Sequence, residues 1–169
     1  MPAPPKQPAE ATVTLSVLDR LIDRDPKNSG EAALTRAQSV RELKSAVRRD
    51  LESLLNTRRV ADEPEESLRE VNRSCYVYGL PDFTGAGLAA PRERARLVRS
   101  LQATVKLFEP RLAQVQVVPL ETHKLNTHTL RFRIEGMLLM NPAPEHVSFD
   151  TVLDITSSEY KIKSDSDAG

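Results

Sequence analysis

The sequence is short of the residues that several kinds of binding surface require. It has no tryptophan, one cysteine, four phenylalanines and three tyrosines in 169 residues. So few rings argue against a surface that stacks bases or sugars. Lysine plus arginine and aspartate plus glutamate are equal, at 24 each, so no overall field attracts nucleic acid or an anionic membrane. The lone cysteine excludes an internal disulfide and fits a reducing compartment.

Long hydrophobic runs are missing as well. No apolar stretch approaches the roughly 18–20 residues that cross a bilayer, and the N-terminus lacks the apolar core of a secretory signal. We therefore expect a cytoplasmic protein without direct membrane insertion. Length and 39% hydrophobic content favour one domain, over residues 13–163. Residues 1–12, rich in proline and alanine, are predicted to be a disordered tail, and residues 164–169 a polar tail.

The usual signatures of metal and cofactor sites are also missing. The three histidines, His123, His128 and His146, have no cysteine or histidine partner at ligand spacing, so we expect no metal site. The glycines of residues 85–87 lack the helix-opening context and the lysine of a phosphate loop. Cys75 has no neighbouring base, and we expect a buried, inert thiol. No cofactor is predicted.

A pair of carboxylates is the one catalytic pattern that needs weighing. A muramidase requires one acid of raised pKa and a second carboxylate at a set distance. Glu109 is a nominal first member, with Asp150 or Glu135 as the second. However, Arg111 and a neighbouring basic helix face would favour the charged form of Glu109. We expect a protein that is not an enzyme, with a cell-wall muramidase as the alternative.

The apolar spacing of the chain changes at residues 108–112. Before this stretch, apolar residues recur every three or four positions, which indicates a helix from Pro91 to about Phe108. After it they recur every second position, which indicates strands. Pro110 explains the change, because its ring disfavours helical backbone at Glu109 and it donates no hydrogen bond. We interpret Glu109, Pro110 and Arg111 as a rigid, exposed charge corner and as the first candidate for a functional surface.

Two further helices precede this one. Residues 14–23 have the spacing of a short amphipathic helix. A longer helix carries one apolar stripe, and Ser39–Glu42 has the spacing of a capping box at its start, with a competing box at Thr35–Gln38 one turn earlier. Residues 67–73 are predicted to form a short helical turn. Residues 74–85 are predicted to be an ordered segment that its aromatic rings pin to the core.

Four strand-like runs follow the corner. They are residues 113–120, 128–140, 146–155 and 159–163, with Gly136 predicted to be a bulge. The hairpin-length connections between the last three predict an antiparallel meander. Helices first and strands second predict an α+β fold, with two to three main helices on a small, mostly antiparallel sheet of about four strands. Lys161 and Lys163 mark the last run as a guarded edge strand.

Four motifs occur in a fixed order along the chain, at residues 18–21, 50–58, 78–83 and 108–112. The series resembles the TssE family of bacterial type VI secretion baseplate subunits. That family is part of a wider group of phage tail baseplate-wedge proteins, historically labelled lysozyme-like. The resemblance extends from about residue 15 to residue 163, and the Asp50–Arg58 run and the Glu-Pro-Arg triplet together make it specific.

The resemblance implies a structural role. Members of the family sit in a cytoplasmic baseplate docked at the inner-membrane complex, where they contact the other wedge subunits, TssF, TssG and TssK. They also resemble a domain of the contractile sheath and are thought to template its first ring. The family's docking triplet corresponds to Glu109, Pro110 and Arg111 here. We therefore expect the edge strand at residues 159–163 to accept a strand from the first sheath subunit.

Overall fold

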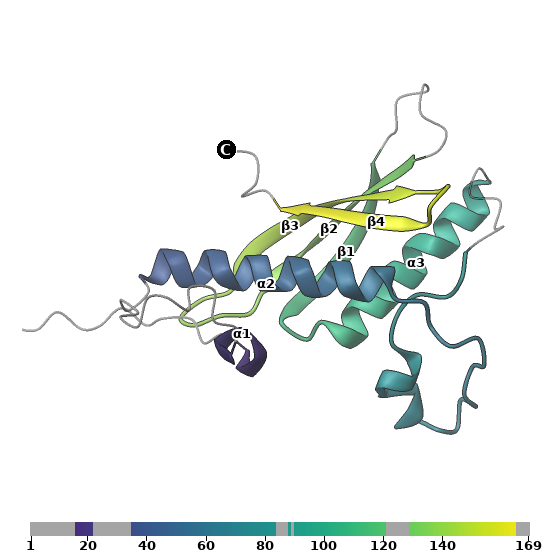
Figure 1. Ribbon diagram of the computed structural model, residues 1–169, viewed down its shortest axis with the longest axis horizontal. Coiled ribbons are helices and arrows are strands. Elements are labelled where there is room, and N and C mark those ends of the chain that lie inside the picture. Colours follow the sequence, from purple (N-terminus) through teal and green to yellow (C-terminus); the bar gives the residue numbers. More distant parts are fainter. Residues whose placement is uncertain (1–15, 22–34, 84–87, 89, 121–128, 165–169) are drawn as a thin grey trace, which may run out of the picture.

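The computed structural model describes residues 16–21, 35–83, 88, 90–120 and 129–164 (Figure 1). In these ranges two long helices pack against a four-stranded antiparallel sheet, which confirms the α+β prediction. The elements are α1 (Val17–Leu21), α2 (Arg36–Asn56), the 3-10 turns η1 (Val71–Arg73) and η2 (Cys75–Val77), α3 (Pro91–Phe108), β1 (Leu112–Leu120), β2 (Thr129–Leu138), β3 (Glu145–Asp154) and β4 (Glu159–Ser164).

The sheet is a simple meander in the order β1-β2-β3-β4. The β2–β3 pair keeps one register from Thr129 opposite Asp154 to Leu138 opposite Glu145. All four predicted strands are present, with ends that differ from the predicted ones by a residue or two where the structure describes them. Ser164 belongs to β4 and pairs with Phe149, so the predicted polar tail begins one residue too early.

The bulge lies in β1 and not, as predicted, in the strand that contains Gly136. Gly136 pairs with Val147 of β3 without any shift, whereas the β1–β2 register shifts between Ala113 and Gln116. Gln114 takes up the extra length with a φ of 53°. A Cβ on Gly136 would lie 3.1 Å from the Ala113 carbonyl oxygen. The glycine therefore accommodates a bulge in its neighbour, because one residue of β2 faces two of β1.

The start of α2 is set by Thr35. The Thr35 hydroxyl accepts from the Gln38 N–H, and the Gln38 side chain accepts from the Thr35 N–H, which is a complete capping box. The box predicted at Ser39 is wrong, and the competing box one turn earlier is the real one. Ser39 is instead buried inside the helix, where its hydroxyl donates to the Thr35 carbonyl.

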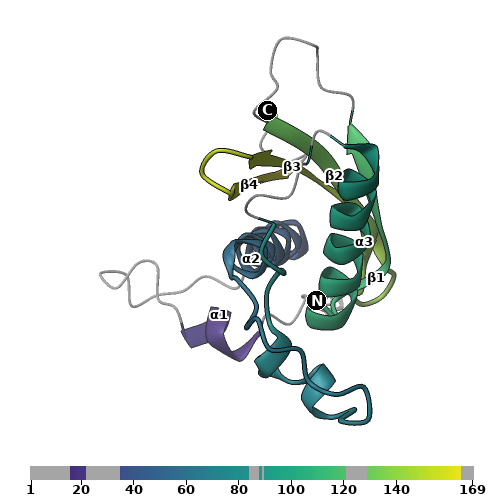
Figure 2. The ribbon, with the colours of Figure 1, turned by 90° about the vertical axis from the view of Figure 1, so that its right-hand side faces the viewer.

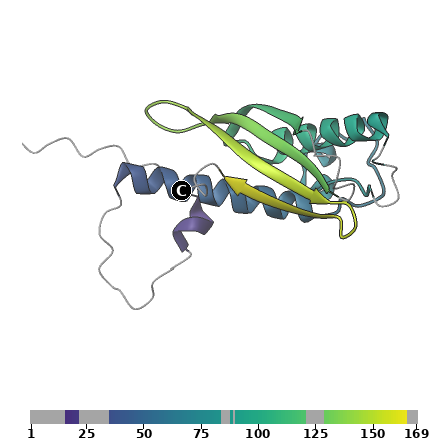
Figure 3. The ribbon, with the colours of Figure 1, turned by 90° about the horizontal axis from the view of Figure 1, so that it is seen from above.

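Both long helices cover the same face of the twisted sheet, with α2 beside β4 and α3 beside β1 (Figures 2 and 3). The core lies between them. Its fully buried large side chains include Leu51 of α2, Leu97 and Leu101 of α3, and Phe132, Ile134, Leu138 and Phe149 of the sheet. The alternate residues of β2 and β3 are at least partly exposed on the other face, where Arg133 pairs with Asp150 at 2.7 Å. Among the described helices, none is long and apolar enough to cross a membrane.

Residues 58–80, which we call the excursion, form a long loop that leaves the end of α2 and returns to it. Its two ends meet where the Arg59 N–H donates to the Leu80 carbonyl and the Leu80 N–H donates to the Thr57 carbonyl, at 2.8 and 2.9 Å. Gly79 makes this approach possible. Its φ is +100°, and a Cβ there would lie 2.3 Å from the Thr57 carbonyl oxygen.

The excursion is held to the core by its buried residues Val77 and Leu80 and by an aromatic contact. The Tyr78 and Phe108 rings meet edge to face, with centroids 5.1 Å apart. This agrees with the predicted role of the aromatic residues, although Tyr76 is 41% exposed. Cys75 is exposed as well. The prediction of a buried thiol is wrong, because Ser74 caps the η2 turn and only Val77 of that turn is buried.

Candidate partner-binding site

The corner predicted from the sequence is a fixed turn between α3 and β1. The Glu109 N–H still donates to the Val105 carbonyl, at 2.9 Å, and so closes the helix. The Leu112 N–H then donates to the Glu109 carbonyl at 3.1 Å, across the intervening proline and arginine. The Arg111 carbonyl accepts from Leu139, just beyond β2, at 2.8 Å. The corner backbone is therefore tied to both the helix and the sheet.

The prediction that Glu109 is exposed is wrong. Its side chain is 4% exposed and lies beneath Arg111, whose side chain is 26% exposed. The Arg111 Nε donates to one Glu109 carboxylate oxygen at 2.6 Å, and Nη2 donates to the other. This is the bidentate geometry in which a guanidinium and a carboxylate interact most strongly. Pro110, between them, is the exposed member of the triplet.

A second carboxylate joins the pair from 61 positions earlier in the chain. The same Arg111 Nη2 donates to Asp50 of α2 at 2.6 Å. Asp50 also accepts from Arg49, and Arg49 donates to Asp19 of α1 at 2.8 Å. We call these five residues the corner network. It links α1 and α2 to the turn between α3 and β1 through alternating charges.

Interactions within the network favour the charged forms of Arg111 and Asp19. Hydrogen bonds to Glu109 and then to Asp50 raise the pKa of Arg111 above its ordinary value, against the opposing effect of burial. Burial alone would raise the pKa of Asp19, but hydrogen bonds from Ser16 and Arg49 lower it to below its ordinary value. Arg111 and Asp19 therefore both keep their charge at neutral pH.

The exposed side chains of the corner network form, together with Pro110, the solvent-facing surface of this site. It consists of Pro110, Arg49 with 39% and Asp50 with 36% of its side chain exposed, and the outer part of Arg111. Sequence reasoning identified Arg111 but missed its partner Asp50 and the link to Asp19. A signal was available, since Asp19 and Asp50 both lie within the ordered motifs. Their convergence on Arg111 depends on the tertiary fold.

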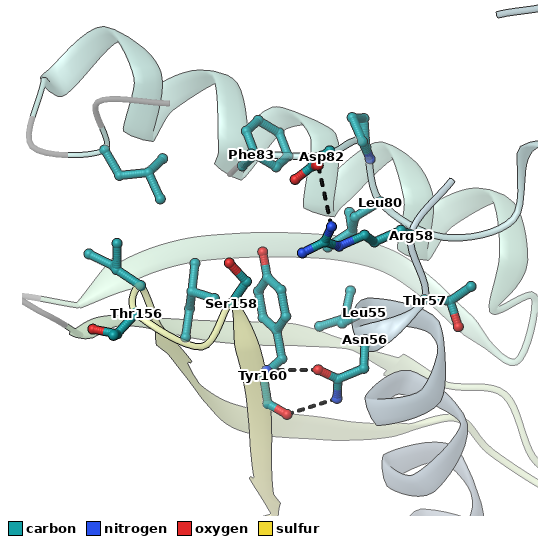
Figure 4. A pocket seen from close by; sticks show the side chains of 14 residues that line it. Leu55, Asn56, Thr57, Arg58, Leu80, Asp82, Phe83, Thr156, Ser158 and Tyr160 are labelled. Carbon is teal, nitrogen blue, oxygen red and sulfur yellow. Dashed lines mark hydrogen bonds and ion pairs between the residues drawn. The ribbon is translucent and has the colours of Figure 1, made fainter. Parts of the chain in front are cut away.

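A second feature lies at the free edge of the sheet. β4 is the edge strand, as predicted. At its start the Asn56 side chain, from the end of α2, accepts from the Tyr160 N–H and donates to the Tyr160 carbonyl, both at 2.9 Å (Figure 4). The Asn56 amide thus takes the place that a neighbouring strand would have at this residue. The outward backbone groups of Tyr160 are already satisfied.

The pocket beside this contact is small. It has a volume of about 120 Å³ and lies between the end of α2, residues 80–83 and the β3–β4 hairpin. Asp82 is the one carboxylate that lines it, and Arg58 pairs with Asp82 at 3.5 Å (Figure 4). Ligand pockets usually occupy roughly 300–1,000 Å³. The pocket is therefore too small to hold a sugar chain.

The carboxylates considered for a muramidase do not face one another. Glu109 is buried at the helix side of the sheet, whereas Asp150 and Glu135 alternate with the core residues of β3 and β2 on the opposite face. Asp150 is paired with Arg133, whose hydrogen bond lowers the Asp150 pKa below its ordinary value. This arrangement gives no pair of carboxylates around a common cleft.

The described residues contain no group of three or more histidine, cysteine, aspartate or glutamate side chains that could hold a metal ion. His146 is exposed near the start of β3. His123, His128 and the glycines at 85 and 87 lie outside the described residues.

Comparison with known protein families identifies a match. The family model described as baseplate wedge protein gp25, GPW_gp25, matches residues 41–143, which is more than half of the chain. The matched range contains most of α2, all of α3, β1 and β2, and the corner. No curated protein matches the chain, and no solved structure matches it.

Proposed function

We propose a structural role in a bacterial type VI secretion baseplate for this chain, which belongs to the baseplate wedge protein gp25 family. The family match carries the proposal, because it spans the corner and most of the helical layer. The assignment to type VI secretion rests on the four ordered motifs, which resemble those of TssE. In this role the chain is not an enzyme and acts in the cytoplasm, in a baseplate docked at the inner-membrane complex.

The corner, Glu109, Pro110 and Arg111, is the proposed docking site for the wedge subunits TssF, TssG and TssK. Two of the Arg111 nitrogens already bind Glu109 and Asp50, so the fork serves mainly to hold the corner in shape. The partner then contacts the exposed proline and the outer sides of Arg111, Asp50 and Arg49. Preorganised charges suit an interface, because little side-chain freedom remains to be lost on binding.

The free edge of β4 is the proposed site at which the first sheath subunit adds a strand. An edge strand presents backbone groups that a further strand can pair with. Because Asn56 occupies the outward groups of Tyr160, an incoming strand either pairs with the part of β4 beyond Tyr160 or displaces the Asn56 amide.

Co-purification tests the docking role. The full chain is co-expressed with TssF, TssG and TssK, and the complex is recovered through a tag on one of them. The test variant carries both Glu109→Ala and Arg111→Ala, so that neither charge is left buried without its partner. We expect wild-type protein to be recovered and the double variant to be lost from the complex. Arg111→Lys should be recovered in part, because an ammonium keeps the charge but not the fork.

The matched control reverses two exposed arginines elsewhere, Arg69→Glu and Arg73→Glu, both in the excursion. It should co-purify like the wild type. A folded double-alanine variant that is recovered in wild-type yield would show that the corner does not dock. A peptidoglycan hydrolysis assay with the purified chain should show no activity, and turnover would favour the muramidase alternative.

A further inference from the structure

The outward face of α3 carries a row of cations that neither the corner nor the β4 edge uses. All four cations are exposed. They are Arg92, Arg96, Arg99 and Lys106, and successive members are four, three and seven residues apart. At 100° per residue they fall on one narrow stripe of the helix, together with the exposed Ala103. We call these five residues the basic stripe. It is about 21 Å long.

The charges of the stripe are largely uncompensated. Arg96 lies 3.9 Å from Glu93, with 70% of the arginine side chain exposed. Within the described part of the chain, Arg92, Arg99 and Lys106 make no ion pair. The whole chain is nevertheless neutral, so the stripe is a local concentration of charge. Such a surface attracts an anionic partner at a rate that depends on salt.

We propose that the basic stripe is a docking surface for an acidic α-helix of a partner protein. The spacing of four and three residues repeats every seven, which is the spacing at which two helices that coil around each other stay in contact. Ala103 lies in the middle of the stripe and allows a second backbone to approach closely. Glutamates with the same spacing on the partner would then meet Arg92, Arg96, Arg99 and Lys106 in turn.

The surroundings of the stripe favour a protein over a nucleic acid or a membrane. Apolar side chains flank it, with Ala95 exposed on one side and Leu107, 39% exposed, on the other. These residues offer a partner helix apolar contact, which phosphates do not use. The excursion contacts the C-terminal end of α3, where the Tyr78 and Phe108 rings meet edge to face. Its five exposed acidic residues would oppose the approach of a polyanion to this part of the molecule. They are Asp62, Glu63, Glu65, Glu66 and Glu70.

The experiment uses the full chain and two designed alanine-based helical peptides of identical composition. One peptide has glutamates spaced alternately four and three residues apart, and the other has the same glutamates in scrambled positions. Binding is measured by fluorescence anisotropy at low and at physiological salt. We expect the spaced peptide to bind the chain about tenfold more tightly than the scrambled one at low salt, because only its carboxylates lie on one face.

Two charge-reversed variants locate the binding surface. Arg96→Glu with Arg99→Glu should weaken binding of the spaced peptide about tenfold, since two attractive contacts become repulsive. Arg69→Glu with Arg73→Glu makes the same change in net charge within the excursion and should leave binding unchanged. Equal binding of the two peptides, or equal loss in both variants, would overturn the proposal.

Competing occupants are tested with the same proteins. Duplex DNA and vesicles that contain an anionic phospholipid replace the peptide, and sedimentation at low salt measures self-association. Tighter binding of DNA or vesicles than of the spaced peptide, lost in the Arg96→Glu/Arg99→Glu variant, would replace the acidic helix with that partner. A dimer that this variant abolishes would identify a second copy as the occupant and would also contradict the proposal.

Discussion

Arg111 connects parts of the chain that are far apart in sequence. We expect the loss of Arg111 alone to destabilise the fold more than the loss of both Arg111 and Glu109. In Arg111→Ala, the Glu109 carboxylate stays buried without its partner, and we expect the free energy of unfolding to fall by about 2 kcal/mol. Glu109→Ala with Arg111→Ala removes that orphan, while Asp50 keeps its contact with Arg49. The double variant should therefore be more stable than Arg111→Ala.

Urea unfolding of the two variants and of wild type measures this difference. If the double variant is instead less stable than Arg111→Ala, the Glu109→Ala substitution causes a further loss of unfolding free energy. The ion pair would then not account for the burial of Glu109.

Asn56 closes the edge of the sheet at a single residue. We expect Asn56→Ala to leave the Tyr160 N–H without a partner, so that its hydrogen exchange becomes at least about tenfold faster. Thr57→Ala is the matched control, because it also removes a side-chain hydrogen bond at the end of α2, from Thr57 to the Ser53 carbonyl at 2.7 Å. NMR-detected exchange should show no change at Tyr160 in this control. Slow exchange at Tyr160 in the Asn56 variant would mean that other groups protect it.

At the scale of the element, α3 has a cation in its first turn that opposes the helix dipole, although Glu93 in that turn and Lys106 in the last turn complement the dipole. Arg92 lies in the first turn, and Ala90 gives no side-chain cap. A negative charge is favoured at that end, so Arg92→Glu should raise the free energy of unfolding by about 0.3–1 kcal/mol. Lys106→Glu, in the last turn, should lower it by a similar amount. Both variants should weaken binding of the spaced peptide, because both reverse a charge of the basic stripe.

Thermal unfolding separates the effect of each substitution on stability from its effect on peptide binding. A variant that is more stable and yet binds less cannot owe its weaker binding to unfolding. If both variants shift stability in the same direction, the helix dipole does not explain either shift.

Periodicity predicted the elements well because it reflects which face of each element is buried. The change of apolar spacing at Pro110 located the end of α3 and the start of β1 to within a residue. The start of α2 stays open by one turn in the sequence, because Thr35 and Ser39 offer similar boxes. The structure decides for Thr35, since Ser39 is buried within the helix. The bulge was assigned to the wrong strand, because a glycine opposite a bulge and a glycine within one look alike.

The candidate site was predictable in part. The rigid corner followed from the local properties of Pro110, which are independent of tertiary structure. The burial of Glu109 did not follow, because it requires Asp50 and α2 to lie beside the corner. The exposure of Cys75 was missed for a similar reason. Tyr76 and Val77 follow it in sequence, but the excursion buries only Val77 of that 3-10 turn.

At the scale of the whole molecule, the free energy of unfolding should decrease at acidic pH. The hydrogen bond from Arg133, with its positive charge, lowers the folded pKa of Asp150 below that of the unfolded chain. Its stabilising effect is therefore complete above the unfolded pKa, about 3.9, and is lost as pH falls through the lower folded pKa. Asp19, also lowered, acts in the same direction. We expect the midpoint of urea unfolding to decline below about pH 4.

Asp150→Asn should show a smaller decline over the same range, because one linked carboxylate is gone. Asp62→Asn, at an exposed position of the excursion, should follow the wild-type curve. An Asp150→Asn curve that parallels the wild type would mean that this carboxylate gains no proton during acid unfolding.

The hydrogen bonds that join the two ends of the excursion have a practical consequence for following assembly. The Arg59 and Leu80 backbones fix both ends of the loop, and the only thiol of the chain, Cys75, lies exposed within it. A maleimide dye attached there would occupy one defined position without any engineered cysteine. It would lie outside the corner, the basic stripe and the edge of β4. Energy transfer from this fluorophore to a labelled partner could then time each docking event in the unmodified sequence.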